Sequence, residues 1–335
     1  MGQQAVAREC VRGSSAPEGG GPAMSNQQSL KDCIERIDRL VVIHPRFRKA
    51  LDRIEGCLFE NVNLATPRGL LIVGPSGSGK STLRNQVIAM QRRIAATERE
   101  KPIVCVSVPS IPTIKSLANT VLCSMGDPLW HKGTAPQLTH RAVTLLRGLA
   151  TRIVLLDEMQ HLADSSRYRG ISRVADWIKE VMDQATANFV LLGLPRAEEV
   201  LKVNEQLRRR FAAKVELSRF DINDPDDFLD FRHLLAAFER TMQFKADPRL
   251  SDGEMAERIY YASDGLPGYL KELLIGALRQ AINEDIGTIR LSHLATAFRE
   301  EIWAGGVGDK NPFGRTFKFR RLDGNGEPFS CATLN

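Results

Sequence analysis

The chain has 335 residues, of which 43% are hydrophobic and 26% charged, the composition of an ordinary globular protein of about two domains. The formal net charge is +6, a mildly basic balance that permits a nucleic-acid partner but does not require one. The longest apolar runs are too short to cross a bilayer, so we expect no membrane partner. The six cysteines form no C-x-x-C pair and lie near no His cluster. Neither a disulfide framework nor a zinc site is therefore expected, and a reducing cytoplasm is the natural compartment.

The first 220 residues divide into a tail and a regular α/β pattern. Residues 1–28, rich in Gly, Ser, Pro and Gln, are expected to be a disordered extension. Apolar periodicity then predicts a helix from Ser29 and a second one ending near Leu58. Over residues 29–220 short apolar runs alternate with amphipathic stretches, which predicts a parallel sheet with helices on both faces. The expected strands are Gly69–Val73, Ile103–Val108, Arg152–Leu156, Phe189–Leu192 and Ala213–Leu217; the expected helices are Ser81–Thr97, Ile114–Ser124, Leu138–Ala150 and Ile171–Ala185.

Beyond Asp221 the strand pattern ends. We interpret residues 221–304 as a small all-helical subdomain and residues 305–335 as a basic C-terminal tail, flexible or ordered by a partner. The expected helices of the subdomain are Phe228–Phe238, Asp252–Ala262, Tyr269–Asn283 and Leu291–Trp303. The tail aromatics are compatible with a docking element for another protein or subunit: Phe313, Phe317, Phe319 and Phe329.

A phosphate-binding motif follows the first expected strand. The segment from Gly74 to Ser81 matches G-x-x-x-x-G-K-[ST] and opens a helix, which is the structural context that this motif needs. Glycines let backbone N–H groups turn toward phosphates, and the helix N-terminus adds a favourable dipole. Lys80 is expected to reach the β- and γ-phosphates of ATP, and Ser81 to ligate Mg²⁺. The expected nucleotide-binding residues here are Gly74, Pro75, Ser76, Gly77, Ser78, Gly79, Lys80, Ser81 and Thr82.

The third expected strand ends in two carboxylates, Asp157 and Glu158. Downstream of a P-loop, the first is expected to hold the Mg²⁺ shell and the second to polarise the attacking water. The adjacent glutamate favours a hydrolytic ATPase over a kinase arrangement, and a small-molecule kinase remains a remote alternative.

Three consecutive arginines, Arg208 to Arg210, precede the last expected strand. One interpretation is a solvated basic helix end, which the helix dipole favours. The other is an arginine finger that stabilises the transition-state charge at a neighbouring subunit's γ-phosphate. The second interpretation makes hydrolysis depend on oligomerisation.

Together these motifs resemble the AAA+ ATPases and, among them, the TniB/TnsC family of transposition regulators, over about residues 29–330. The P-loop and the acidic strand end are common to AAA+ proteins, whereas the run Asp157–Leu162, the stretch Asp264–Leu274 and Asn311-Pro-Phe313 are more specific. Further matching segments are His44-Pro-Arg-Phe47, Leu192-Gly-Leu-Pro195 and Arg208-Arg-Arg-Phe211.

The resemblance implies an α/β P-loop AAA+ fold with a five-stranded parallel sheet and a helical lid. It implies an ATPase that oligomerises on double-stranded DNA with ATP and links a target-selection protein to a DDE transposase in the bacterial cytoplasm, hydrolysis then disassembling the oligomer. The segment before the P-loop often borders the adenine in such proteins, which suggests Val42, Ile43 and His44. The position of the finger before an aromatic residue makes Arg210 the first choice and Arg209 the second.

Two positions depart from the AAA+ pattern. The fourth strand runs into Gly193 and Leu194, so it offers no polar side chain to position the water. Gly268 replaces the usual lid arginine, and Lys271, one helical turn on, is the candidate substitute. Slow hydrolysis, suited to a timing switch, is the expected consequence.

Loops after the second and third strands face the central channel in AAA+ oligomers. Here they carry the candidate DNA contacts Thr113, Lys115, Arg167 and Arg169, which would bind phosphates independently of sequence. The alternative for each of these residues is an ordinary solvated surface side chain. Two other functions stay open: a replication-initiator or helicase-loader ATPase, and a nucleotide-gated scaffold or signalling switch that hardly hydrolyses ATP.

Overall fold

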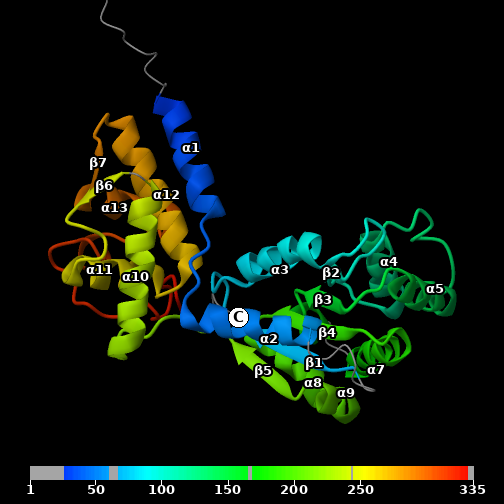
Figure 1. Cartoon of the computed structure of the whole chain (residues 1–335). Helices are drawn as coiled ribbons and strands as arrows, with labels where there is room; N and C mark the ends of the chain where they lie inside the picture. Colours follow the sequence, from blue (N-terminus) through cyan, green and yellow to red (C-terminus); the bar gives the residue numbers. More distant parts are fainter. Residues whose placement is uncertain (1–25, 60–66, 165–167, 243, 331–335) are drawn as a thin grey trace, which may run out of the picture.

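A five-stranded parallel sheet forms the centre of the larger of two bodies (Figure 1). The computed structural model describes residues 26–59, 67–164, 168–242 and 244–330. The strand order is β2-β3-β4-β1-β5, and every neighbouring pair is parallel. The strands are β1 (Gly69–Val73), β2 (Ile103–Ser107), β3 (Ile153–Asp157), β4 (Asn188–Gly193) and β5 (Ala213–Glu216). All five expected strands are present, with ends shifted by no more than one residue, and the α/β fold class is confirmed.

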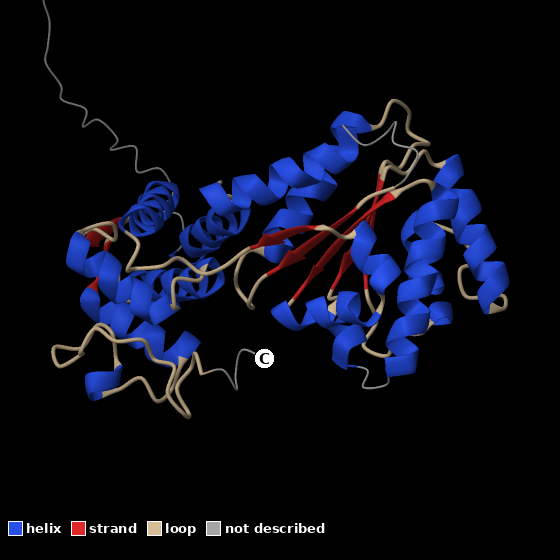
Figure 2. Ribbon diagram, turned by 90° about the horizontal axis from the view of Figure 1, so that it is seen from below, coloured by secondary structure: helices blue, strands red, loops and turns tan. Residues whose placement is uncertain are grey.

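The sheet is buried on both faces. Successive side chains of a strand point to opposite sides, and each side packs against helices. Leu70 and Ile72 of β1 pack with one group of helices, whereas Leu71 and Val73 pack with another. The first group is α2 (Pro45–Phe59) and α3 (Lys80–Ile94). The second comprises α4 (Ile114–Met125), α5 (Ala135–Gly148), α6 (Gln160–Asp164), α7 (Tyr168–Ala185), α8 (Glu199–Val203) and α9 (Glu205–Arg210). Figure 2 shows the strands between these two helical layers.

The smaller body, the lid, is mainly helical. Its helices are α10 (Pro225–Met242), α11 (Gly253–Ser263), α12 (Pro267–Asn283) and α13 (Leu291–Ala297), the last continued by a π-helical turn at Phe298–Ile302. The expectation of an all-helical lid is wrong in one respect, since β6 (Lys245–Asp247) and β7 (Thr288–Arg290) form a short parallel pair. Strands of three residues with charged ends carry no alternation that a sequence pattern can detect.

The first described helix, α1 (Asn26–Arg39), belongs to the lid rather than to the sheet. Cys33 and Ile37 are buried in the lid core, and Figure 1 shows α1 beside α10 and α12. The expected division at residue 29 is therefore corrected. Helical periodicity indicates which face of a helix is apolar but not which body it packs against. Residues 1–25 of the expected N-terminal extension lie outside the described residues.

The C-terminal segment 305–330 also packs into the lid, which corrects the expectation of a flexible tail. Phe313, Phe317 and Phe329 are buried with Leu322 in the lid core, and Phe319 packs partly against it. The main chain of this segment is irregular apart from a 3-10 turn at Gly308–Lys310. Its apolar residues therefore follow neither helix nor strand periodicity, although they anchor the segment. The aromatic rings that were candidates for docking a partner serve the protein's own core instead.

Candidate nucleotide site

A cavity of about 600 Å³ lies between the two bodies, at the carboxyl end of the sheet. Parallel α/β sheets commonly bind ligands at this edge. Its lining residues come from the P-loop, from the end of α1 and the segment after it, from the turn after β3 and from the start of α12. The expected residues brought together here are Ser76, Gly77, Ser78, Gly79, Lys80, Ser81, Thr82, Glu158, Val42, His44 and Lys271.

The P-loop backbone turns at two positions that only glycine adopts without strain. Gly77 and Gly79 have φ angles of +76° and +96°, in the left-handed region that favours glycine. Helix α3 begins directly afterwards at Lys80, so the N–H groups of its first turn have no partner within the helix. The hydroxyl of Ser78 is buried and has no hydrogen-bond partner in the described structure. These orphaned donors fit a phosphate group.

The ammonium group of Lys80 lies folded back on the P-loop. It donates to the carbonyl oxygens of Gly74 and Pro75, both at 2.7 Å. Burial lowers the pKa of Lys80 to about 8, although Glu158 and Asp157 pull it upward. Gly74 and Pro75 thus contact the lysine through their backbones rather than lining the cavity. A phosphate in this cavity would meet a nearby cation that is only partly hydrated.

The two acidic residues after β3 are held differently. Asp157 is buried, its Oδ2 pairs with Arg84 of α3 at 2.8 Å, and its Oδ1 accepts the N–H of Glu158 at 2.9 Å. Glu158 lines the cavity and has a φ of 61°, a strained conformation for a residue with a side chain. This turn directs the Glu158 carboxylate toward the cavity rather than along the strand.

As expected, β4 itself ends in Gly193 and offers no polar side chain there, but a neighbouring helix supplies one. Gln160, the first residue of α6, is buried and lines the cavity. Its Nε2 donates to Oε2 of Glu158, and its Oε1 accepts the N–H of Leu194 at 3.1 Å. Gln160 was missed because it is close to β4 only in space. The contact is long-range, and no local pattern signals it.

The segment before α2 forms an apolar end of the cavity. Val42 and His44 line it together with Leu234 and Phe238 of α10, which suits a flat ring such as adenine. The ring of His44 is 5.0 Å from that of Phe220. Burial, aided by the Arg46 cation, lowers the pKa of His44 to about 4, so the imidazole is neutral near pH 7.

The lid contacts the P-loop directly. The N–H of Gly268 donates to the carbonyl oxygen of Gly77 at 2.8 Å, and an added Cβ on Gly268 would lie 2.6 Å from the Gly77 Cα. Lys271, the expected substitute for a lid arginine, also lines the cavity and forms an ion pair with Asp38 of α1. Lid movement is therefore coupled sterically to the phosphate-binding turn.

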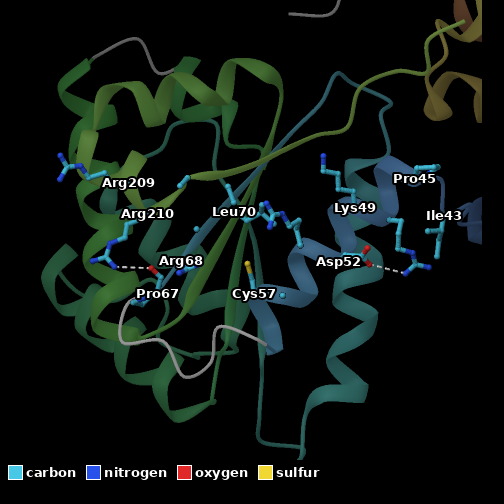
Figure 3. A pocket seen from close by; sticks show the side chains of 16 residues that line it. Ile43, Pro45, Lys49, Asp52, Cys57, Pro67, Arg68, Leu70, Arg209 and Arg210 are labelled. Atoms are coloured by element: carbon cyan, nitrogen blue, oxygen red, sulfur yellow. Dashed lines mark hydrogen bonds and ion pairs between the residues drawn. The ribbon is translucent and has the colours of Figure 1, made fainter. Parts of the chain in front are cut away.

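The candidate finger arginines lie away from this cavity, beside a second one of about 1460 Å³ (Figure 3). Arg210 is partly buried, pairs with Asp183 at 2.9 Å and reaches the Pro67 carbonyl oxygen at 3.4 Å. Arg209 is exposed and pairs with Glu205 of its own helix. Neither arginine lines the chain's own nucleotide cavity, so neither is placed to act there within one chain.

The candidate DNA contacts fall into two groups. Thr113 caps α4, accepting the N–H of Ser116, and Lys115 is exposed on the first turn of that helix. Arg167 lies outside the described residues, and so does the side chain of Arg169. Among the candidate cations, Lys115 is the one whose side chain the structure describes, and it is exposed.

The donors present fit Mg²⁺ with ATP. Ser81 lines the cavity with a hydroxyl oxygen, whereas the Asp157 carboxylate lies behind it and would have to exchange Arg84 for the ion. Both are oxygen ligands of the kind that Mg²⁺ prefers, and this ion is commonly held by a few protein oxygens and by substrate phosphates. The cradle of N–H groups, the buried Ser78 hydroxyl and Lys80 fit the phosphates themselves.

A protein-family comparison identifies the chain. The family model "Bacterial TniB protein" matches residues 34–221, more than half of the chain. The chain belongs to the TniB family. The matched range holds the whole sheet, the P-loop and the turn after β3, whereas most of the lid lies beyond it.

Solved structures place this TniB protein among the AAA+ ATPases in fold. The Aeropyrum pernix ORC2 protein, solved in ADPNP–ADP complexes, has a TM-score of 0.61 and 16% identity, covering 79% of this chain and 71% of that one. Cdc6p from Pyrobaculum aerophilum has a TM-score of 0.61 and 12% identity, covering 80% and 70%. The A. pernix ORC1 protein in complex with DNA has a TM-score of 0.56 and 16% identity, covering 82% and 69%. At these identities the likeness is one of fold.

A curated relative matches only a short stretch. The mouse dynein heavy chain domain-containing protein 1 is 36% identical over 81 residues, which is 24% of this TniB chain. The chain spans 2% of the length of that relative.

No helix in the described part of the chain combines the length and the apolar character needed to cross a membrane.

Proposed function

We propose that this TniB protein hydrolyses ATP, assembles on double-stranded DNA in its ATP state and regulates DNA transposition in the bacterial cytoplasm. The observation that carries the proposal is the cavity in which the P-loop, Glu158 and the lid meet. In this proposal the assembly links a target-selection protein to a transposase, and hydrolysis releases it.

The residues of the cavity divide the work of hydrolysis. Backbone N–H groups of the P-loop and the Lys80 ammonium bind the phosphates, and Val42 and His44 border the base. Glu158 orients water, whose oxygen attacks the γ-phosphorus as the bond to the β–γ bridging oxygen breaks, and accepts the proton that the water loses. Mg²⁺, held by Ser81 and Asp157, would neutralise charge on the β- and γ-oxygens.

The remaining catalytic charge comes from a second copy of the chain. Arg209 and Arg210 lie outside the cavity that their own chain forms, so a guanidinium reaches a γ-phosphate only across a subunit interface. Arg210 would have to leave Asp183 to do so, whereas Arg209 is already exposed. Such a requirement makes hydrolysis slow until subunits assemble.

The DNA part of the proposal rests on Lys115 and on the resemblance in fold to ORC1, which was solved in complex with DNA. Lys115 is exposed on the first turn of α4, where the helix dipole adds to its charge. Binding would be to phosphates, independent of base sequence and weakened by salt.

A mixing experiment tests the shared active site. Glu158→Gln removes the base and keeps the arginines, whereas Arg210→Ala removes the first-choice finger and keeps the base. Each variant alone is expected to lose hydrolysis, while an equal mixture regains about a quarter of the wild-type rate, the fraction of interfaces that join two intact halves. Arg209→Ala replaces Arg210→Ala in a parallel series. If neither mixture regains activity, neither Arg209 nor Arg210 acts as a finger across the subunit interface.

The DNA assembly is tested by electron microscopy with duplex DNA and a non-hydrolysable ATP analogue, compared with ADP. Filaments or rings that need the analogue, and that weaken in Lys115→Ala, support the proposal. A protein that stays monomeric with both nucleotides supports the alternative of a nucleotide-gated scaffold. The fold similarity to ORC and Cdc6 proteins favours a second alternative, an initiator-like ATPase. For such a protein, we expect ATP hydrolysis to be stimulated in the absence of any transposase.

A further inference from the structure

Gln160 is a polar side chain of the cavity that hydrogen-bonds to Glu158, and its two hydrogen bonds define its orientation. The N–H of Leu194 can only donate, so the carbonyl oxygen of the Gln160 amide must face it, at 3.1 Å. The NH₂ group of the same amide is then turned toward Oε2 of Glu158, to which it donates. One buried amide thus joins the catalytic carboxylate to the end of β4.

The amide is packed closely against the end of β4. An added Cβ on Gly193 would lie 2.9 Å from the Gln160 Oε1 and 2.9 Å from the Ala197 Cβ, so a larger residue at the end of β4 would displace the glutamine. The backbone ties the same elements together, since the Met159 N–H donates to the Leu192 carbonyl oxygen at 3.0 Å. The absence of a side chain at Gly193 therefore makes room for Gln160.

The strained backbone of Glu158 explains why such a restraint matters. A φ of 61° is costly for a residue with a side chain and persists where neighbouring contacts fix it. With Oε2 held by Gln160, the other oxygen, Oε1, stays free to accept a proton from water. A carboxylate without this restraint would rotate among several rotamers, few of which face the γ-phosphate.

We propose that Gln160 is a positioning residue for hydrolysis, holding Glu158 in place of the polar side chain that β4 lacks. This inference rests on the proposed ATP hydrolysis.

The test compares Gln160→Met, which keeps the length of the side chain but cannot donate, with the wild type. With enzyme in saturating excess over ATP, the single-turnover rate is expected to fall about 10- to 100-fold, as when a residue that orients a reacting group is removed. The Kd for a non-hydrolysable ATP analogue is expected to stay within about twofold, since the phosphates do not depend on Glu158. Gln280→Met is the matched control, because Gln280 donates to Glu300 in the same way on the outside of the lid.

A double-mutant cycle separates positioning from a structural role. In the Glu158→Gln background, Gln160→Met should slow hydrolysis no further, because the group that it positions is already absent. A multiplicative loss, an unchanged single-turnover rate or a loss confined to nucleotide affinity would each overturn the inference. If Gln160→Met does not fold, Gln160→Glu, which keeps the shape and abolishes the donor, takes its place.

A readout independent of activity is the side-chain ¹⁵N–H resonance of Gln160 in the nucleotide-free protein. It is expected to move in Glu158→Gln, where a neutral acceptor replaces a charged one. An unmoved resonance would contradict the hydrogen bond on which the inference is built. Wild-type protein that does not hydrolyse ATP at all would refute the proposed function itself, whereas hydrolysis that is insensitive to Gln160 would refute only this inference.

Discussion

The imidazole of His44 lies beside the rings of Phe47 and Phe220, with centroid distances of 6.0 and 5.0 Å. Its Nδ1 is buried and has no hydrogen-bond partner in the described structure. Burial and the nearby Arg46 cation lower the pKa to about 4, from 6.5 for a free side chain, and only Asp227 opposes them. The charge of Arg46 is partly neutralised by Asp227, with which it forms an ion pair at 2.5 Å. The folded protein therefore keeps His44 neutral where the unfolded chain protonates it.

This difference predicts that stability falls in acid. Between pH 6.5 and 4 the unfolded state binds the extra proton, so His44 contributes its full stability above pH 6.5 and loses it as pH falls toward 4. The loss is expected to reach about 2 kcal/mol at pH 5 relative to pH 7.5. Urea unfolding at several pH values measures it. In His44→Gln, the free energy of unfolding should fall by about 2 kcal/mol less between pH 7.5 and pH 5 than in the wild type. A variant of the exposed His131, such as His131→Gln, should follow the wild type. Parallel profiles for His44→Gln and the wild type would refute the assignment.

At the scale of elements, the sequence predicts the sheet well and the partners of its helices poorly. Strands such as β1 and β3 consist of buried apolar residues bounded by polar or turn-forming ones, so their position is a local property. The P-loop is equally local, and its residues 76–82 line the cavity as expected. Gln160 and the docking of α1 on the lid depend on contacts between distant parts of the chain. No periodicity within one segment carries that information.

The contact between the P-loop and α12 yields a prediction at this scale. Gly268→Ala would place a methyl group 2.6 Å from the Gly77 Cα, a backbone atom that cannot move aside without distorting the phosphate-binding turn. Overpacking of this kind costs about 1–3 kcal/mol, so the Kd for ADP is expected to rise by about 10- to 100-fold. Titration with a fluorescent ADP measures it. Gly253→Ala, at the first turn of α11, is the control because an added Cβ there meets nothing within 4 Å. An unchanged Kd for Gly268→Ala would mean that the lid moves away from the P-loop when nucleotide binds.

At the scale of the whole molecule, three parts of the chain meet at Asp264. This residue is 1% exposed and precedes the Gly265–Gly268 turn that reaches the P-loop. Arg321 of the C-terminal segment binds both of its carboxylate oxygens, at 2.5 and 2.7 Å. Arg219, from the connection after β5, contacts Oδ2 at 3.2 Å. The larger body, the lid and the C-terminal segment are therefore joined through one buried carboxylate.

Removing one arm of this junction should destabilise the lid. Arg321→Ala leaves the buried Asp264 with Arg219 alone, and breaking a buried ion pair completely costs about 3–5 kcal/mol. We expect a loss of about 2–3 kcal/mol, because Arg219 still compensates part of the charge. Urea unfolding gives the free energy, and limited proteolysis shows whether the segment from residue 305 onward becomes accessible to protease. Arg315→Ala removes an exposed arginine from the same segment and should change neither measurement. Equal stability of Arg321→Ala and Arg315→Ala would mean that the buried aromatic rings alone, rather than the ion pair, hold the segment on the lid.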